Sequence, residues 1–351
     1  PIHHGFAEYF GLLTGGTTYF SGSHPEAVLD PDRPAGTRAG REIYRGREVV
    51  EVEEYLTDVF TREAVDFIDR HAGGEAPFFL VLSYNAPHTP LQATREYMDT
   101  VAHVEDPRTR IYAAMVSSVD RGVGAVADRL AAHGIDDDTL VVFMSDNGCV
   151  GYAAIACSNG PFSGTKRFHL EGGIRIPFIM HWPNGLEGGQ VYREPVISLD
   201  LFATFAGIAG ASLDDGVVRD GVDLVPYLTG AADGRPHDIL YWRAGPNRAI
   251  RMGRWKLFEV NRADPAAAHG QGRLLPLRDY PDASPHGQVS LLYDLRDDEA
   301  ERANLADRLP ERLRDLQDRL DRWESSLARP VWPSNRSTIT EIDGELVQLF
   351  F

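Results

Sequence analysis

The first third of the chain combines one segment of helical periodicity with one continuous apolar run. Apolar side chains recur at helical spacing over residues 57–72, where Thr57 or Asp58 is the expected N-cap and Gly73 follows the end. The run from Phe78 to Leu82 has no polar position, as expected of a strand buried on both faces. A helix therefore precedes a buried strand here.

The same order repeats further along. Apolar positions near helical spacing predict a helix over residues 108–132, and an apolar strand is expected at 140–144. A third apolar segment starts at Ile174, and an apolar helix follows a cap expected at Ser198 or Asp200. The alternation of helices and strands predicts an α/β fold with a parallel sheet covered by helices.

The last third of the chain has a different pattern. Composition shifts over residues 228–238, which places the expected boundary between a domain of residues 1–232 and a second of residues 233–351. Alternating residues around Gly253–Arg254 predict a hairpin, and leucines at intervals of three and four predict an amphipathic helix over 309–327. The second domain should therefore be α+β, with an antiparallel sheet.

Composition narrows the function classes. The chain has 351 residues, 43% of them hydrophobic, and a formal net charge of −17, which argues against a nucleic-acid partner. No apolar run reaches the roughly 18 residues of a membrane span. Cys149 and Cys157 are too few for a disulfide scaffold or a zinc site, and two free thiols are expected although a bridge is conceivable.

Polar side chains follow two of the predicted strands, where ligands gather in open parallel sheets. Asp146 and Asn147 come directly after strand 140–144, and their oxygens suit calcium or magnesium rather than zinc. Taken alone, the tetrapeptide of residues 145–148 is more often a turn that ends a strand. Two ligands are also too few for a calcium shell of about six to eight oxygens, so other ligands must come from elsewhere.

Two further residues could act on an anionic substrate. His88 lies between two prolines, and a stiff loop suits a side chain that donates a proton or hydrogen bond; a histidine satisfied by the backbone is equally compatible. Lys166 lies among glycines and could point at an anionic oxygen, although a single lysine is usually solvated. The same cluster offers Arg167 and His169. His169 and Arg175 rank lower, and Arg175 is expected to pair with an acid such as Glu171 rather than contact substrate.

Nine segments together form a more specific pattern than any one motif. They are GFAEYFGLLTGG, YLTDVFTREAVDFIDRH, PFFLVLSYNAPHTPLQ, YAAMVSSVDRGVGAVADRL, TLVVFMSDNG, GTKRFHLEGGIRIPFIMHWP, PVISLDLFATFAGIAG, RMGRWKL and LYDLRDDEAERANLA. In order and spacing they resemble the type I sulfatase family of the alkaline-phosphatase-like superfamily, in its arylsulfatase and carbohydrate-sulfatase branch. The resemblance covers nearly the whole chain.

The resemblance implies a mixed sheet sandwiched by helices, a smaller C-terminal domain and hydrolysis of sulfate esters. It places Asp146 and Asn147 in the shell of one Ca²⁺ ion, and it gives His88 and Lys166 the task of gripping the sulfate and its ester oxygen. His88 would also be the proton donor to the leaving alcohol. The implied partner is a sulfated small molecule or glycan, and the oligomeric state is open.

Three family motifs have no match in this chain: a paired-aspartate calcium motif, a CxPxR or SxPxR segment whose Cys or Ser becomes the formylglycine nucleophile, and a GKWHLG-like segment. Cys149 and Cys157 do not fit the pattern of the modified residue. We therefore expect an N-terminally truncated member with an incomplete calcium shell and negligible turnover by itself. Periplasmic or secreted localisation would follow family habit, but no signal segment is visible.

Two other hypotheses stay open at this point. The chain could be a phosphate-ester hydrolase of the same superfamily, which would need a second set of metal-binding His and Asp residues. It could also be an inactive sulfatase-like fragment that binds sulfated glycans or nothing at all.

Overall fold

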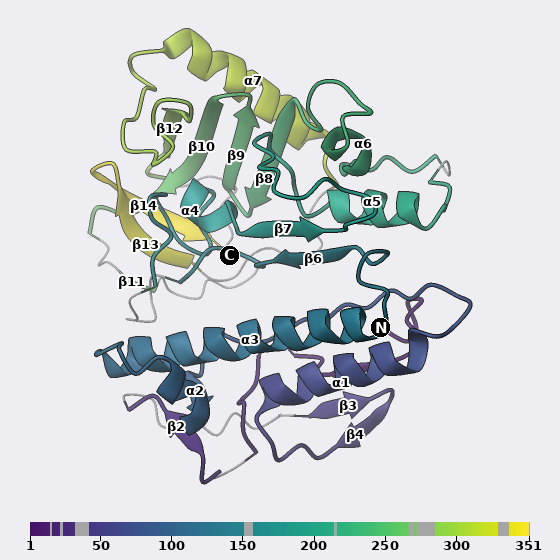
Figure 1. Ribbon diagram of the computed structural model, residues 1–351. Coiled ribbons are helices and arrows are strands. Elements are labelled where there is room, and N and C mark those ends of the chain that lie inside the picture. The colour runs from purple at the N-terminus through teal and green to yellow at the C-terminus, as the bar shows by residue number, and fades with distance from the viewer. Residues whose placement is uncertain are drawn as a thin grey trace. The chain divides into compact units, whose positions relative to one another are not determined.

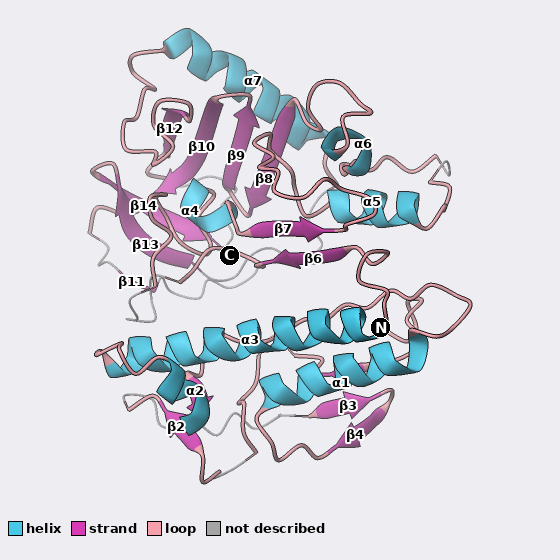
Figure 2. Cartoon of the chain, viewed as in Figure 1, coloured by secondary structure: helices cyan, strands magenta, loops and turns pink. Residues whose placement is uncertain are grey.

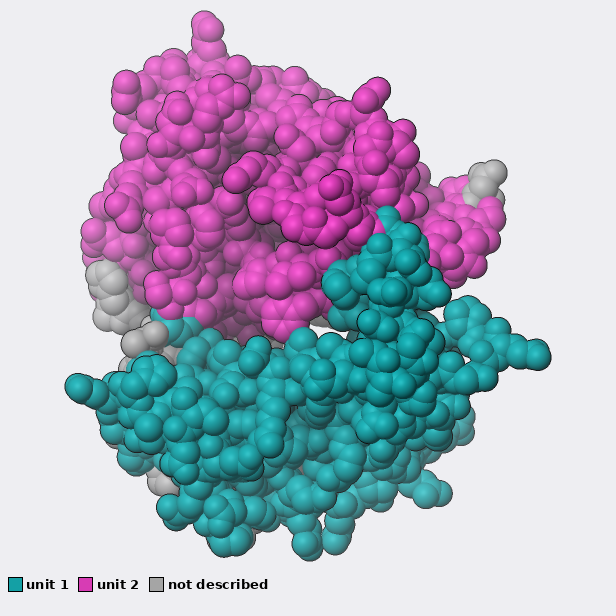
Figure 3. All heavy atoms as spheres, viewed as in Figure 1, with its two compact units in different colours: residues 1–141, 152–157, 181–185 teal, residues 142–151, 158–180, 186–351 magenta. Residues whose placement is uncertain are grey.

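The computed structural model describes most of the chain, which divides into two compact units (Figure 3). The described residues are 1–14, 16–21, 24–31, 42–150, 157–213, 216–266, 270–271, 285–328 and 337–350. Unit 1 comprises residues 1–141, 152–157 and 181–185, and unit 2 comprises residues 142–151, 158–180 and 186–351. The expected boundary at residues 232 and 233 stays a prediction.

Unit 1 is built around two helices that pack side by side (Figure 1). Its helices are α1 (Leu56–His71), α2 (Arg95–Thr100) and α3 (Pro107–Ala132), and its short strands are β1 (Phe10–Gly11), β2 (Ala27–Leu29), β3 (Ile43–Arg45), β4 (Glu48–Val50) and β5 (Gln92–Thr94). Strands β1, β3 and β4 form one antiparallel sheet, and β2 pairs with β5. The apolar faces of α1 and α3 meet in the core of this unit.

Both long helices of unit 1 were predicted from periodicity, but the cap of α1 was not. Asp106 caps α3 by accepting the backbone N–H of Thr109. In α1 the N-cap is Tyr55, without a capping side chain, so the prediction of Thr57 or Asp58 was wrong. The Asp58 carboxylate instead accepts the hydroxyl of Tyr97 at 2.5 Å.

The apolar run at residues 78–82 is not assigned as a strand, and the prediction of a strand buried on both faces was wrong. Phe79 and Val81 are each 55% exposed. Leu82, the last residue of the run, and Tyr84 pack against the core of unit 1. The segment thus buries one face among the described residues and leaves the other exposed.

Strands β6 (Val141–Met144) and β7 (Phe178–His181) pair with each other (Figure 2). The N–H of Ser145 donates to the carbonyl of Pro177 at 3.3 Å. The N–H of Asn184 donates to the carbonyl of Asp137 at 3.0 Å. These bonds place the end of β6 beside the start of β7, so the pair is antiparallel. Among the described residues no parallel strand pair is assigned, contrary to the parallel sheet expected from the order of elements.

Unit 2 contains a seven-stranded sheet in the order β11-β13-β14-β10-β9-β8, with β12 also paired to β10. Its strands are β8 (Ile239–Ala244), β9 (Asn247–Met252), β10 (Trp255–Arg262), β11 (Gly270–Gln271), β12 (Gln288–Asp294), β13 (Ser337–Ile342) and β14 (Glu345–Phe350). Its helices are α4 (Glu171–Ile174), α5 (Asp200–Ile208), α6 (Val225–Leu228) and α7 (Pro310–Ser326). The predicted hairpin and amphipathic helix are confirmed by β9–β10 and α7. Every register pair in the sheet is antiparallel, as expected.

Strand periodicity assigns the two faces of this sheet to different partners. Leu257 of β10 packs with Leu316 and Leu320 of α7 on one face. Phe258 and Val260 are in the opposite cluster, which includes Leu170 and Phe168 from the segment before α4. The sheet therefore carries α7 on one side and the loop that contains Lys166 on the other.

The cap expected for α5 at Ser198 or Asp200 was also wrong, because the N-cap is Leu199 without a side-chain bond. The buried carboxylate of Asp200 accepts the backbone N–H groups of Ile197 and Val222 and pairs with His237. Among the described residues, no helix is long and apolar enough to cross a membrane.

Candidate functional site

The turn after β6 presents the two predicted metal ligands beside a glycine that cannot be replaced. Asp146 is exposed, Asn147 is half-buried and Gly148 is buried. The N–H of Gly148 donates to the carbonyl of Gly173 at 3.0 Å, and a Cβ at position 148 would lie 1.8 Å from the carbonyl oxygen of Gly172. Because that neighbour is backbone, only glycine fits.

Hydrogen bonds join this turn to the loop that carries Lys166. The N–H of Lys166 donates to the carbonyl of Cys149 at 3.0 Å. The Asn159 side chain accepts the N–H of Cys149 at 2.7 Å and donates to the carbonyls of Cys149 and Gly164 at 3.2 and 3.1 Å. The structure therefore brings the segment of Asp146 and Asn147 together with that of Lys166, and Asn159, which sequence reasoning missed, holds them.

The loop around Lys166 is packed so closely that its glycines are structural requirements. A Cβ at Gly173 would lie 2.1 Å from the carbonyl oxygen of Phe168, and Arg167 has a φ of 86°, in the left-handed region. Lys166 is half-buried, and no hydrogen bond or ion pair of its ammonium is found within the described part of the chain. This side chain remains available to an anionic ligand.

A buried charge cluster fixes the far end of the same loop to the sheet. Lys256 of β10 is fully buried, and its Nζ lies 2.8 Å from Glu171 Oε1 and 2.9 Å from Glu301 Oε1. Glu301 also accepts the N–H of Glu171 through Oε2 at 2.5 Å. The cluster was not predicted, although a lysine in the strand phase of Phe258 and Val260 is a signal of it.

The pKa values of the two acids in the cluster, Glu171 and Glu301, are shifted in opposite directions. Burial alone would raise the pKa of Glu171, but the charge and hydrogen bond of Lys256, with Arg251 and Arg175, lower it. Burial raises the pKa of Glu301, and Lys256 only partly opposes this. Arg175 lies 3.9 Å from Glu171 Oε2, which confirms the predicted pairing.

The surroundings of His169 argue against a role in binding an anion. Burial, together with the charge of Lys256, lowers the pKa of His169 to about 4, so the imidazole is neutral at pH 7. Its ring packs edge-on against Phe258 at 5.7 Å, and its Nδ1 is buried without a partner among the described residues. This supports a structural role for His169.

His88 belongs to unit 1 and is held by its own loop. Its Nδ1 lies 2.7 Å from the carbonyl of Thr89, which can only accept, so Nδ1 carries the proton and Nε2 is the nitrogen left for another partner. The hydroxyl of Tyr19 lies 2.7 Å from the carbonyl of Asn85 and 2.9 Å from that of His88. That His88 acts on the same sulfate as Lys166 stays a prediction.

The donor set after β6 fits a hard cation in kind but not in number. A carboxylate from Asp146 and an amide oxygen from Asn147 are the ligand types of calcium. Among the described residues there is no group of three or more His, Cys, Asp or Glu that could hold a metal ion. Together these two residues would supply only part of a calcium shell of about six to eight oxygens.

The two cysteines are disulfide-bonded, so the expectation of free thiols was wrong. Asn159, two residues after Cys157, binds both the N–H and the carbonyl of Cys149. The hydrogen bonds of Asn159 therefore hold the segment after Cys157 next to Cys149. Residues 151–156 between them lie outside the described part of the chain.

Comparison with known proteins identifies the family. The sulfatase family model matches residues 3–211. The mouse (Mus musculus) N-acetylgalactosamine-6-sulfatase is 34% identical over 260 residues, 73% of this chain and 48% of its own length. Human (Homo sapiens) steryl-sulfatase is 35% identical over 192 residues, 53% of this chain and 32% of its own length. The chain thus spans about half or less of these relatives.

Solved structures agree. The crystal structure of Ps i-CgsB in complex with k-i-k-neocarrahexaose is 31% identical, with a TM-score of 0.77 over 95% of this chain and 69% of that one. The likeness confirms the expected α/β, alkaline-phosphatase-like fold. With a family model that matches more than half of its residues, this chain belongs to the sulfatase family, as the sequence motifs indicated.

Proposed function

We propose that the protein to which this chain belongs hydrolyses sulfate esters of a carbohydrate or aryl alcohol. The observation that carries the proposal is the backbone connection between the turn of Asp146 and Asn147 and the loop of Lys166. The loop of Lys166 is bonded to the segment that carries two hard oxygen donors, and its ammonium has no hydrogen bond or ion pair among the described residues. Such a pairing suits a sulfate group, which offers oxygens both to a cation and to a hydrogen-bond donor.

In this proposal each residue has a distinct task. Lys166 binds a sulfate oxygen as a compact positive charge and stabilises the charge that develops during transfer. His88 donates a proton from Nε2 to the leaving oxygen, while the Thr89 carbonyl keeps its ring oriented through Nδ1. Asp146 and Asn147 would be two ligands of a calcium ion, which when bound polarises the sulfate group.

The nucleophile of the proposed reaction is a formylglycine supplied by residues outside this chain. Without it the chain by itself should show negligible turnover, because removal of a nucleophile costs several orders of magnitude even where binding groups remain. Of the alternatives considered, the phosphate-ester hydrolase has no supporting observation, since the relatives named above are sulfatases.

Hydrolysis of an aryl sulfate by the longer gene product, with calcium present, tests the proposal. We expect Lys166→Ala and His88→Ala each to lower kcat/KM by about 10²–10⁴-fold. The matched control is Arg322→Ala, an exposed position on α7 that should leave turnover unchanged. Activity that survives Lys166→Ala at the level of the control would refute the role given to this lysine.

A further inference from the structure

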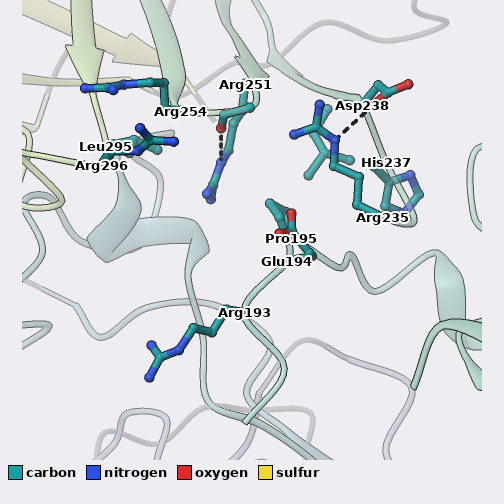
Figure 4. A pocket seen from close by; sticks show the side chains of 12 residues that line it. Arg193, Glu194, Pro195, Arg235, His237, Asp238, Arg251, Arg254, Leu295 and Arg296 are labelled. Atoms are coloured by element: carbon teal, nitrogen blue, oxygen red, sulfur yellow. Dashed lines mark hydrogen bonds and ion pairs between the residues drawn. The ribbon is translucent and has the colours of Figure 1, made fainter. Parts of the chain in front are cut away.

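A hollow in unit 2 gathers arginines from several separate elements (Figure 4). Its volume is about 250 Å³, below the roughly 300–1,000 Å³ of cavities for drug-sized ligands, so it suits one small charged group. It is lined by Arg193, Glu194, Pro195, Arg235, His237, Asp238, Leu240, Arg251, Gly253, Arg254, Leu295 and Arg296. The lining contains five arginines and two carboxylates, in a chain whose formal net charge is −17.

The arginines differ in how far their charge is already neutralised. Arg254 pairs with Asp294 and with Asp297, and Arg235 pairs with Asp238 at 3.0 Å. Arg251 lies 3.6 Å from Glu171. Neither Arg193 nor Arg296 forms an ion pair within the described part of the chain. The lining therefore includes two guanidinium groups without an ion-pair partner among the described residues.

The walls of the hollow are fixed before any ligand binds. The carboxylate of Asp294 accepts the backbone N–H of Arg296 at 3.2 Å, and the N–H of Leu295 donates to the carbonyl of Arg254 at 2.8 Å. On the other side, the ring of His237 pairs with the buried carboxylate of Asp200 at 2.8 Å. These bonds hold the backbone of the walls in place before any ligand binds, which favours affinity.

The side chains also converge. In Figure 4 the guanidinium groups of Arg235, Arg251 and Arg296 approach the same open space from different elements, whereas Arg193 and Arg254 are directed away from it. A guanidinium offers planar pairs of N–H donors that match two oxygens of one oxyanion. Three such groups around one small space suit an oxyanion rather than a neutral ligand.

We propose that this hollow, which we call the arginine pocket, binds a sulfate group that is distinct from the one gripped by Lys166. The group is either a second sulfate ester of the glycan or the free sulfate ion. The proposal rests on the proposed function only in naming sulfate as the anion. Arg251 of the pocket lies 3.6 Å from Glu171, the first residue of α4 at the end of the loop of Lys166.

Two probes test the pocket: sodium sulfate, and a sulfated hexasaccharide compared with its desulfated form, at constant low ionic strength. Binding is measured by calorimetry for the wild type, Arg296→Ala and Arg235→Ala. We expect each variant to bind the sulfated hexasaccharide about tenfold more weakly than the wild type. The desulfated form should not bind to any of the proteins. Arg322→Ala, an exposed arginine of α7, should change affinity less than twofold.

The arms of the experiment separate the sources and the two proposals. If the pocket variants bind sodium sulfate more weakly as well, the pocket is assigned to free sulfate. If they bind only the sulfated hexasaccharide more weakly, the pocket is assigned to a sulfate ester. Because the readout is binding, a lack of aryl-sulfate turnover in the longer gene product, which includes the nucleophile, would contradict the proposed function and leave the pocket standing. If Lys166→Ala abolishes binding of both probes while both pocket variants bind like the wild type, the pocket is overturned.

Discussion

The ammonium of Lys256 lies 2.8 Å from Glu171 Oε1, and the two side chains are 0% and 2% exposed. This buried ion pair connects β10 of the large sheet to the first residue of α4, at the end of the loop that carries Lys166. A charge cannot leave water at this depth without a partner. The pair therefore fixes one end of the candidate site to the sheet.

We predict that Lys256→Met lowers the free energy of unfolding by about 3 kcal/mol, the lower end of the range for breaking a buried pair. The lower end is expected because Arg251 and Arg175 remain 3.6 and 3.9 Å from Glu171 Oε2. Urea unfolding followed by circular dichroism measures it. The matched control is Lys166→Met, which removes an ammonium without an ion pair in the described structure and should cost less than about 0.5 kcal/mol. Equal losses in the two variants would contradict the role of the buried pair.

The two acids that share Lys256 should respond to pH in opposite directions. The pKa of Glu171 is lowered, so its ionised form adds stability above its ordinary pKa of about 4.3, and that stability is lost as pH falls through the folded-state value. The pKa of Glu301 is raised, so its ionisation costs stability as pH rises above the same ordinary value. Glu301 Oε1 also lies 2.9 Å from Nζ but without hydrogen-bond geometry, which fits the more readily protonated acid.

We therefore predict that the deficit of Glu171→Gln relative to the wild type grows as pH rises towards 4.3, whereas the deficit of Glu301→Gln shrinks as pH rises above it. Unfolding free energies at pH 3.5, 5 and 7 would show this, because glutamine imitates the protonated acid at every pH. Parallel pH dependence of the two deficits would mean that both acids have the same protonation state in the folded protein.

Gly148 provides a steric test of the junction between the two loops. Because a Cβ there would lie 1.8 Å from the backbone oxygen of Gly172, Gly148→Ala must displace the turn of Asp146 and Asn147 or the start of α4. We expect a loss of about 3 kcal/mol in unfolding free energy. Gly188→Ala is the control in the same unit, since nothing lies within 4 Å of its Cβ and its cost should stay within about 0.5 kcal/mol. A well-tolerated Gly148→Ala would show that this packing is not needed.

The parts of the fold that were predictable are those set by local periodicity. Helices α3 and α7 and the β9–β10 hairpin have strong repeats of apolar residues, and the structure has them where the pattern indicated. Pairing direction between β6 and β7 could not be read locally, because it depends on how the chain returns. The run at 78–82 misled for a related reason: an apolar run reports a tendency to be buried, not the presence of a partner strand.

The candidate site was predictable where side chains differ chemically from their surroundings. Asp146 and Asn147 stand out as polar residues at a strand end and Lys166 as a cation among glycines, and the structure brings their segments together. Asn159 was invisible because its role is to hold backbone groups, which any polar residue of a loop could do. Glu171 was considered only as a partner of Arg175, since a contact with β10 across 85 positions leaves no local trace.

Tyr19 braces the loop of His88 and gives a separate test within unit 1. Its hydroxyl lies 2.7 and 2.9 Å from the carbonyls of Asn85 and His88, and burial raises its pKa well above the usual value, so it remains a donor at all ordinary pH. Tyr19→Phe leaves these carbonyls without that donor and should cost about 1–3 kcal/mol of unfolding free energy. The control is Tyr112→Phe, whose half-buried hydroxyl has no hydrogen bond among the described residues and should be nearly neutral.

The same pair of variants separates a bracing role from a purely global one. If Tyr19 positions His88, then in the longer gene product Tyr19→Phe should lower kcat for an aryl sulfate even at temperatures far below its melting point, while Tyr112→Phe does not. The loss should be smaller than that of His88→Ala, because the bond from Nδ1 to the Thr89 carbonyl still orients the ring. A Tyr19→Phe variant with reduced stability and unchanged kcat would limit this hydroxyl to folding and leave the orientation of His88 to its own loop.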